Sequence, residues 1–591
     1  MKRSNAIRSV LVFFLAVTVL FVCYVSALQV LVREIHASNE ATFVATELLG
    51  RPTDNSVTVN VIAEEDLEVY FEYGTRPGVY SGKTEIAQFL GGDPIEVVID
   101  GLKSNTRYYY RMVYRKIGAT EWIRRSEHSF HTQRAKGSTF TFTITSDSHL
   151  GFPLNLGNST LYRRTMLNVL RDMPDFHIDL GDTFPMMAFV NDTAGASQVY
   201  LAQRPYLGLI GHSVPIFLVI GNHENEEGWN LDDTPSQPIL SVNARKRYYP
   251  NPVPSSFYSG NTDPLAEIDE DHLREDYYAW QWGDALFVVI DPFWYTMTKP
   301  YVNEPGEKND ENVSGDPWDW TLGRQQYEWL KQTLRNSNAK FKFVFAHHVT
   351  GGIDQYGRGG AMAVPYFEWG GYDLDGSWGF TTRRPGWETP IHQLFIENNV
   401  TIFFCGHDHQ YAKQQRDGII YQVCPMPSDI RYSAGFNIYN LSNPYTQVVL
   451  NNSGHLRVTV SPTQVTVDYV RAYLSEGING QVAYTYTIAP SIIAYSPAAT
   501  STPSLPEFPS PSAAPFNSPP PTLSVSPVPS LLLSPSPTPP ISETPPITAY
   551  LIAATAASII VVTTSVMIIK KILRKKVCVY DKTRHSCKLK R

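Results

Sequence analysis

The chain has 591 residues, too many for one ordinary hydrophobic core, so we expect two or more folded units. Its 49 Lys and Arg against 56 Asp and Glu give a formal charge of −7. This balance argues against a nucleic-acid partner, because nucleic-acid-binding proteins usually carry a basic face. Aromatic residues make up 12% of the chain, which suits a β-rich protein.

The first residues have the pattern of a targeting signal. Basic residues precede an apolar run over residues 10–25, and Val25-Ser26-Ala27 is typical of a cleavage site. We therefore predict a signal peptide over residues 1–27, with an uncleaved signal anchor as the alternative. In either case the chain after Leu28 is predicted to leave the cytoplasm.

Residues 37–134 predict a small all-β sandwich, because short alternating runs are separated by turn residues. The runs that suit half-buried strands are Ser56–Ile62, Leu67–Tyr73, Ile95–Ile99 and Arg107–Tyr114. Leu102–Tyr108 is similar to the corresponding loop and strand of a fibronectin type III module. We see no set of polar residues there that would carry chemistry, and we expect a structural role for this region.

Residues 138–488 alternate strand and helix patterns, which predicts an α/β layered domain. Buried strands are expected at Thr139–Thr145, Phe176–Leu180, Ile216–Ile220, Ala285–Ile290, Lys342–Ala346 and Thr401–Cys405. Helical patterns lie between several of them, as at Thr160–Arg171 and Arg324–Arg335. In sheets of this kind the chemistry lies in loops beyond the carboxyl ends of the strands.

The last hundred residues predict a membrane anchor. Residues 496–546 are mostly Pro, Ser and Thr, a composition that cannot bury a core and is typical of an extended stalk. Residues 547–569 are apolar and uncharged, and long enough to span a bilayer. Basic residues follow at once, so the tail over 570–591 is predicted to be cytoplasmic and the preceding region external.

Two further patterns concern the region between the signal and the membrane segment. It contains Cys405 and Cys424, so one disulfide is possible there, but a disulfide scaffold is excluded. It also contains N-x-S/T sequons, which fit an external location, at Asn158, Asn191, Asn312, Asn399, Asn440 and Asn451.

Five predicted strands end in loops that carry metal-ligand residue types. These loops are Asp147-Ser148-His149, Gly181-Asp182, Gly221-Asn222-His223-Glu224, His347-His348 and Gly406-His407-Asp408-His409. A lone histidine at a strand end is more often a core or surface residue, so the prediction depends on the set. Two neighbouring metal ions need a bridging carboxylate with imidazole and oxygen ligands around it. No cysteine takes part, which disfavours a structural zinc site with thiolate ligands.

This set of motifs, from Asp147 to His409, resembles the signature of the calcineurin-like metallophosphoesterase superfamily. The fibronectin-like module and Tyr411 after the last histidine make the chain similar to the purple acid phosphatases. The resemblance implies β-sheets flanked by helices behind an all-β sandwich, and hydrolysis of phosphate esters with two metal ions. The stalk and the membrane segment lie outside the resemblance.

The resemblance also implies two triads of ligands around one bridging carboxylate. One triad would hold the first metal ion and consists of Asp147, His149 and His409. The other would hold the second ion and consists of Asn222, His347 and His407. Asp182 would bridge both ions, and His223 would protonate the leaving oxygen while a metal-bound hydroxide attacks phosphorus. His348 is the alternative to His347, which we favour because it ends the strand.

The first two loops depart from the purple acid phosphatases. Those enzymes use a tyrosine three residues after the bridging aspartate to bind ferric iron, and this chain has Pro185 there. Their first loop lacks histidine, whereas here His149 follows Asp147 closely. We therefore expect no purple charge-transfer band, and the divalent or trivalent metals remain open among Mn, Fe, Zn and Co.

Residues 354–387 are an insertion rich in glycine, aromatic residues and arginine. Arg358 or the pair Arg383-Arg384 could clamp a substrate phosphate, because a guanidinium matches its geometry. The alternative is a packed surface loop whose arginines are solvated.

The sequence therefore predicts a phosphatase anchored in the cell membrane by one segment, with its catalytic domain outside the cytoplasm. Small phosphomonoesters are the expected substrates. A phosphodiesterase or nucleotidase of the same superfamily is one alternative, and a catalytically silent cell-surface binding protein is another. The presence of every expected metal ligand argues against the silent binding protein, because relatives that have lost activity usually lose some of these residues. The physiological substrate and the oligomeric state are left open.

Overall fold

The computed structural model describes residues 18–19, 21–22, 25, 40–152, 157–186, 190–269, 271–302, 312–354, 356–434, 438–439, 441–490, 578–581 and 586–589. The chain divides into two compact units, of which one is Ser38–Ala494 and the other joins Met1–Ala37 to Tyr495–Arg591. In the second unit the described residues include a hairpin of β24 (Cys578–Asp581) and β25 (Ser586–Leu589).

No helix among the described residues is long and apolar enough to cross a membrane. The predicted membrane segment, 547–569, and the predicted stalk, 496–546, lie outside the described residues. The predicted signal, 1–27, is described only at five positions, which are helical. The anchor therefore remains a prediction from the sequence.

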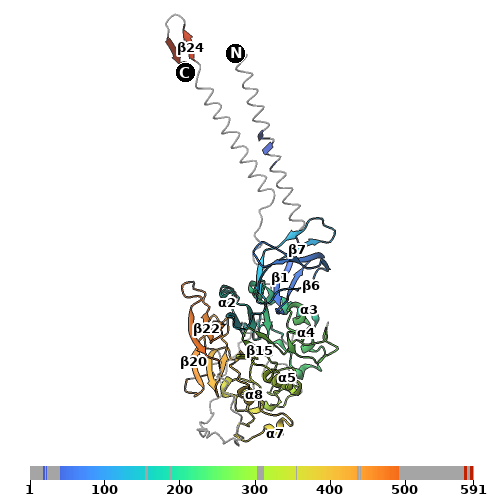
Figure 1. Ribbon diagram of the computed structural model, residues 1–591, viewed down its shortest axis with the longest axis vertical. Coiled ribbons are helices and arrows are strands. Elements are labelled where there is room, and N and C mark those ends of the chain that lie inside the picture. Colours follow the sequence, from blue (N-terminus) through green and yellow to red (C-terminus); the bar gives the residue numbers. More distant parts are fainter. Residues whose placement is uncertain are drawn as a thin grey trace, which may run out of the picture. The chain divides into compact units, whose positions relative to one another are not determined.

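The unit Ser38–Ala494 begins with two packed antiparallel β-sheets (Figure 1). The smaller sheet has the order β1 (Phe43–Gly50), β2 (Val57–Ala63), β6 (Pro94–Ile99). The larger has β4 (Gly82–Lys83), β3 (Leu67–Gly74), β7 (Arg107–Lys116) and β8 (Ile123–Arg124), with β5 (Ala87–Phe89) beside β3 and β9 (His128–His131) beside β7. The four strands expected from alternating residues are thus confirmed as β2, β3, β6 and β7.

A six-stranded sheet follows, with the order β12-β11-β10-β21-β22-β23. Its strands are β10 (Phe140–Thr145), β11 (Phe176–Asp179), β12 (Ile216–Leu218), β21 (Gly454–Val460), β22 (Val465–Arg471) and β23 (Val482–Ile488). The first three run parallel, so their carboxyl ends meet at one edge, and the last three pair antiparallel.

An eight-stranded sheet has the order β13-β14-β15-β16-β17-β19-β18-β20. Its strands are β13 (Ser259–Gly260), β14 (Tyr278–Trp282), β15 (Ala285–Val289), β16 (Phe341–Phe345), β17 (Ile402–Cys405), β18 (Tyr411–Arg416), β19 (Ile419–Val423) and β20 (Thr446–Leu450). The central strands β15, β16, β17 and β19 are parallel.

Phenylalanine rings fill the core between these two sheets. The Phe142 ring of β10 lies 5.1 Å from Phe287 of β15 and 5.6 Å from Phe343 of β16. All three side chains are fully buried, and they belong to one apolar cluster with residues of both sheets. Burial of such rings is the main favourable contribution to holding the sheets face to face.

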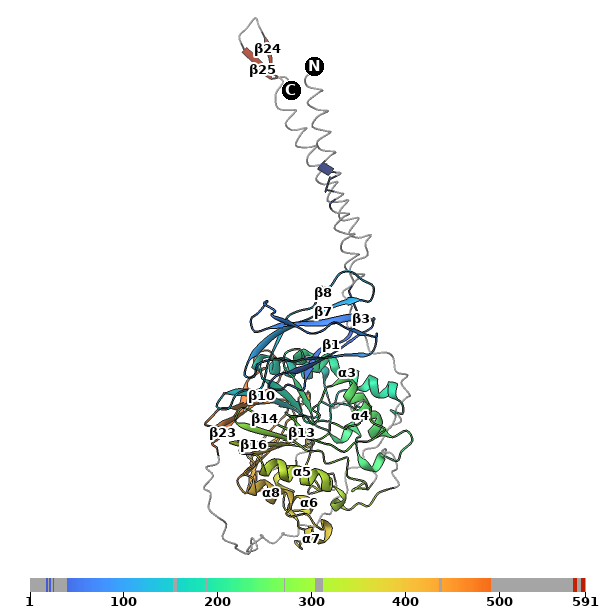
Figure 2. The ribbon, with the colours of Figure 1, turned by 45° about the vertical axis from the view of Figure 1, so that its right-hand side comes forward.

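Helices cover the outer faces of both sheets (Figure 2). α2 (Ser159–Asp172), α3 (Thr193–Gly211) and α4 (Gln237–Tyr248) pack on the six-stranded sheet. α5 (Gly323–Arg335) and α8 (Ile391–Glu397) pack on the eight-stranded sheet. The layers are therefore helix, sheet, sheet, helix. This confirms the α/β class that the alternation predicts and the sheets flanked by helices that the resemblance implies.

The two predicted helices form where expected for simple reasons. α2 begins after Asn158, whose side chain accepts a hydrogen bond from the Leu161 N–H at 3.0 Å. α5 buries Tyr327, Leu330 and Leu334, which recur at helical spacing on one face.

The two cysteines of this unit are free thiols. Cys405 belongs to the core under α5 and α8, and Cys424 belongs to the core between the sheets. Because their side chains lie on opposite faces of the eight-stranded sheet, they do not form the disulfide that the sequence alone allowed.

Candidate metal centre

Each of the five predicted loops follows a strand that the structure contains: β10, β11, β12, β16 and β17. Six of the seven predicted ligands form two buried clusters, which are Asp147, His149, Asp182 and His409, and Asp182, His347 and His407. In each cluster the ligand atoms lie within 4.8 Å of one another. Asp182 belongs to both, which is the arrangement that a bridging carboxylate requires.

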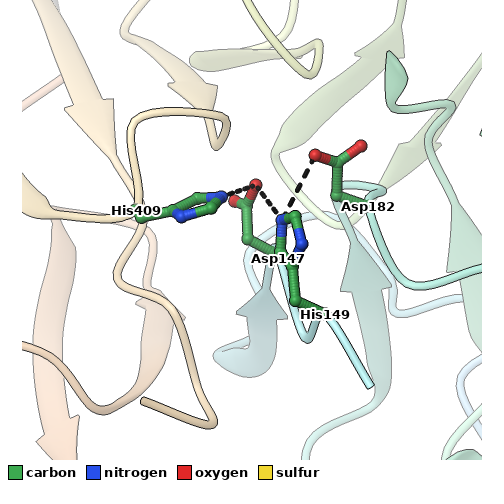
Figure 3. A group of neighbouring side chains, drawn as sticks. All are labelled: Asp147, His149, Asp182 and His409. Atoms are coloured by element: carbon green, nitrogen blue, oxygen red, sulfur yellow. Dashed lines mark ion pairs between the residues drawn. The ribbon is translucent and has the colours of Figure 1, made fainter. Parts of the chain in front are cut away.

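The first cluster is drawn in Figure 3. The His409 Nε2 atom lies 3.3 Å from Asp147 Oδ1, and His149 Nε2 lies 3.4 Å from Asp182 Oδ2. These separations exceed the usual N–H···O distance of about 2.9 Å. Two ligands that are each about 2.1 Å from one ion lie roughly 3.0–3.4 Å apart, so the spacing suits a shared ion better than direct hydrogen bonds.

In the second cluster, hydrogen bonds to backbone carbonyls set the orientation of both histidine rings. The His347 Nδ1–H donates to Leu180 O at 2.8 Å, and the His407 Nε2–H donates to Tyr356 O at 2.8 Å. In each ring the other nitrogen then carries the lone pair that a metal needs. For His347 this is Nε2, which lies 3.3 Å from Asp182 Oδ2.

The neighbouring His348 is in neither cluster of described residues. Its Nδ1–H donates to Val349 O at 2.7 Å, and its ring lies 4.7 Å from the Trp320 ring. This placement favours His347 over His348 as the ligand.

Several buried polar atoms at the centre lack hydrogen-bond partners among the described residues. They include His149 Nε2, His347 Nε2 and Asn222 Oδ1. An unpaired buried polar atom costs about 1–3 kcal/mol, so these atoms need a partner that the protein itself does not supply. Nitrogen and oxygen donors without thiolates suit Mn, Fe, Zn or Co. The residues therefore fit the two metal ions that the sequence predicts.

The electrostatics agree with this fit. Burial would raise the pKa of Asp147 and of Asp182, but the surrounding histidines hold both below the ordinary value. Conversely, burial would lower the pKa of His149, but the adjacent Asp147 and Asp182 raise it to about 9. The carboxylates are thus kept ionised by positive charge beside them, which bound divalent ions supply directly.

The predicted proton donor, His223, lies at the edge of the centre and is half-buried. Its Nε2 is 3.9 Å from Asp182 Oδ2, and its ring packs 4.8 Å from Phe152. Burial is the main cause that lowers the pKa of His223 to about 4. Its backbone N–H donates to Asp182 Oδ1 at 2.9 Å, which leaves Oδ2 of that carboxylate facing the histidines.

The backbone at the centre is strained. Asp147, His149, Asp182, His407 and His409 all have φ between 48° and 68°, a left-handed conformation that costs side-chain-bearing residues about 1–3 kcal/mol each. Backbone bonds hold the conformation: the Asp147 N–H donates to Gly181 O at 2.9 Å, and the His149 N–H donates to Asp182 O at 3.2 Å. Strain of this kind gathers at sites whose geometry is set by function.

Glu224 is a site residue whose role was not predicted from the sequence. It is 1% exposed, and its carboxylate accepts four backbone N–H bonds, from Gly221 at 2.6 Å and from Asp182, Thr183 and Phe184 at 2.9 Å. It therefore fixes the Asp182 loop against the loop that carries Asn222 and His223. An acidic residue in the first turn of a helical segment was the signal that could have found it.

The structure separates the arginines of the insertion. Arg384 donates to Glu368 and to Trp320 O and belongs to the packing of this region, whereas the exposed Arg383 forms a surface ion pair with Asp316 at 2.8 Å. Arg358 stacks on Tyr356, with its guanidinium 4.9 Å from the ring centre, and its charge helps to lower the pKa of His407. Arg358 is thus the one of the three that lies beside the metal centre.

Comparison with known proteins shows what part of this chain is similar to. Residues 140–411 match the calcineurin-like phosphoesterase family. Among solved structures, the fold is similar to that of PhoD, with a TM-score of 0.54, 14% identity, and coverage of 76% of this chain and 90% of PhoD. The purple acid phosphatase PPD1 from yellow lupin (Lupinus luteus) seeds has a TM-score of 0.49 and 17% identity, with coverage of 75% and 74%. A comparison with the curated proteins found no match.

Proposed function

Because the chain carries a calcineurin-like metallophosphoesterase domain with an intact buried metal site, we propose that this metal-dependent phosphoesterase hydrolyses phosphomonoesters. The observation that carries the proposal is Asp182, which belongs to two buried ligand clusters at once. A carboxylate shared in this way is what a dinuclear hydrolytic centre needs, and it has no evident role in a silent binding protein.

The ligands are assigned from the two clusters. One metal ion would be held by Asp147, His149 and His409, and the other by Asn222, His347 and His407, with Asp182 common to both. Asn222 is included because its Oδ1 is buried without a partner among the described residues. When bound, the two ions would supply charge neutralisation at the phosphoryl oxygens and an activated water.

The chain's own contribution to bond cleavage is assigned to His223. When the bond between phosphorus and the leaving oxygen breaks, that oxygen needs a proton, and His223 is the half-buried imidazole that lies next to Asp182. The Phe152 ring and the hydrogen bond from the His223 N–H to Asp182 hold it in place.

Hydrolysis by the purified protein tests both assignments. With Mn²⁺ or Zn²⁺ added, we expect turnover of 4-nitrophenyl phosphate that exceeds turnover of bis(4-nitrophenyl) phosphate, and that is lost in Asp182→Asn. His223→Ala should slow an alkyl phosphate by about 10²–10⁴-fold but slow 4-nitrophenyl phosphate much less, because 4-nitrophenolate leaves without a proton. Equal losses on both substrates would exclude His223 as the proton donor. If the metal-bound protein hydrolyses neither 4-nitrophenyl phosphate nor the alkyl phosphate, the proposed phosphatase activity is contradicted.

We also propose that the catalytic domain lies outside the cytoplasm, anchored by residues 547–569. The sequence pattern of the two ends supports this, as do the exposed sequon residues Asn191, Asn399 and Asn451. In a eukaryotic secretory host, treatment with an N-glycosidase should increase the mobility of the protein, and extraction should require detergent. Unchanged mobility together with release by salt alone would contradict the proposal.

A further inference from the structure

Four aromatic side chains from separate parts of the chain form a continuous group beside the metal centre. Trp229 follows the Asn222 loop in the 3₁₀ turn η2 (Gly228–Asn230), and its ring lies 5.7 Å from Trp320 and 6.2 Å from Tyr301. The Tyr301 ring in turn lies 5.1 Å from the Tyr356 ring. Trp320 is 1% exposed, whereas the other three are half-buried. We call Trp229, Tyr301, Trp320 and Tyr356 the aromatic wall.

The aromatic wall is joined to the metal ligands at two points. The carbonyl oxygen of Tyr356 accepts the hydrogen bond from His407 Nε2 at 2.8 Å. The Trp320 ring lies 4.7 Å from His348, whose ring lies 5.1 Å from His407. The wall is therefore one side chain away from the second ligand cluster, within reach of the organic group of a bound phosphate ester.

Cations fix the orientation of two rings of the wall. The Arg358 guanidinium stacks 4.9 Å from the Tyr356 ring centre, and the Lys299 ammonium lies 4.5 Å from the Tyr301 ring centre. Arg358 is half-buried, and its charge helps to lower the pKa of His348 and of His407, so it lies near the second ligand cluster. A planar guanidinium on a tyrosine can pair with a phosphate oxygen at its edge while its face supports an aromatic ring.

We propose that the aromatic wall binds the organic group of the substrate, and that this group carries an aromatic ring. The proposal rests on the phosphoesterase function above and deepens it by naming the substrate class. Trp229, which meets the buried Trp320 edge to face, is only half-buried, and on its exposed part a further ring gains more than an aliphatic group of equal size. Nucleotides and aryl esters share this chemistry.

Two pairs of substrates with matched reacting bonds test the proposal. In the first pair, 2-phenylethyl phosphate and 2-cyclohexylethyl phosphate have nearly equal size and leaving-group chemistry but differ in aromaticity. We expect kcat/KM to favour the phenyl compound roughly threefold to tenfold, which is the gain typical of one aromatic pair. In the second pair, AMP and ribose 5-phosphate differ in the base. A preference for AMP identifies a nucleotide, and a preference limited to the phenyl pair identifies a simple ester whose alcohol carries an aromatic ring.

Substitutions locate the preference. Trp229→Leu and, independently, Tyr301→Leu should each reduce the ratio of kcat/KM for the phenyl compound to kcat/KM for the cyclohexyl compound toward one. Trp122→Leu is the matched control, because Trp122 is also half-buried with a tyrosine ring 5.0 Å away and an arginine 4.5 Å over it, but it lies on the N-terminal β-sandwich. This control should keep the full preference.

The failure of the inference can be told apart from failure of the proposed function. If the protein hydrolyses both members of each pair equally, or if Trp229→Leu and Tyr301→Leu keep the preference, the aromatic wall is not a substrate surface, although the phosphoesterase stands. If no ester is hydrolysed, the function itself is wrong. Calorimetric titration with 2-phenylethylphosphonate and its cyclohexyl analogue then tests the wall alone, and equal affinities would overturn it.

Discussion

Replacement of Glu224 by glutamine tests whether the metal loops are held by one buried carboxylate. The Glu224 carboxylate accepts two N–H bonds at each oxygen: Gly221 and Asp182 donate to Oε2, and Thr183 and Phe184 donate to Oε1. A glutamine side chain has one oxygen and presents an NH₂ group to the other two donors.

The expected magnitude follows from this geometry. Two charge-assisted hydrogen bonds are lost, at about 1.5–3 kcal/mol each, so the free energy of unfolding should fall by about 3–6 kcal/mol. Because Asp182 and the loop with Asn222 are then less well positioned, metal affinity should also fall, by about 10–100-fold. Denaturant titration measures the first quantity, and competition with a chelating indicator measures the second.

Glu368→Gln provides the control for this prediction. Glu368 is also fully buried and accepts bonds from Thr321, Leu322 and Arg384, but it lies in the packing of the insertion. It should reduce stability and leave metal affinity unchanged. If the metal affinity of Glu224→Gln equals that of Glu368→Gln, the argument that Glu224 positions the metal loops is refuted.

Three further predictions concern colour, pH and a loop glycine. With Pro185 in place of a tyrosine, the iron-loaded protein should show no strong visible absorption band, and a purple colour would mean that the ligand assignment is wrong. Burial lowers the pKa of His177 from 6.5 to about 3, so as pH falls the histidine is protonated in the unfolded chain before it is protonated in the folded protein. His177 should therefore not destabilise the folded protein above about pH 6.5, and should lower its free energy of unfolding as pH falls below that value. His177→Gln should flatten this decline by at most about 1.4 kcal/mol per pH unit. Denaturant titrations from pH 4 to 7 measure it, and an unchanged slope would contradict the assignment. Gly357 has φ of +84°, and a Cβ there would lie 2.6 Å from His348 Nδ1, so Gly357→Ala should lower the melting temperature. Gly376 has the same φ within a degree but open space around it, so Gly376→Ala should act through backbone strain alone and lower the melting temperature less.

The sequence predicted those parts of the fold that depend on local pattern. Alternating residues located β3 and β7 of the sandwich, and a five-loop pattern after buried strands located the metal centre. This worked because the carboxyl ends of β10, β11 and β12 must meet at one edge once the strands are parallel. The alternation of strands and helices likewise predicts the α/β class, whereas the packing of two sheets face to face does not follow from it.

The remaining features depend on contacts that no local pattern encodes. The orientation of His407 is set by a backbone carbonyl at Tyr356, and every residue has a carbonyl, so its identity carried no signal. His347 is favoured over His348 by the neighbours of each ring, Asp182 in one case and Trp320 in the other. The aromatic wall joins four segments that are far apart in the chain.

The metal content of the wild-type protein, compared with that of a variant at the bridging residue, tests the central claim most directly. The purified full-length protein, saturated with Mn²⁺ or Zn²⁺ and freed of excess ions, should contain about two ions per chain by elemental analysis. Asp182→Asn should contain one or fewer, because it removes the carboxylate that both ligand clusters share. One ion or none in the wild-type protein, or two ions retained in Asp182→Asn, would contradict the dinuclear centre.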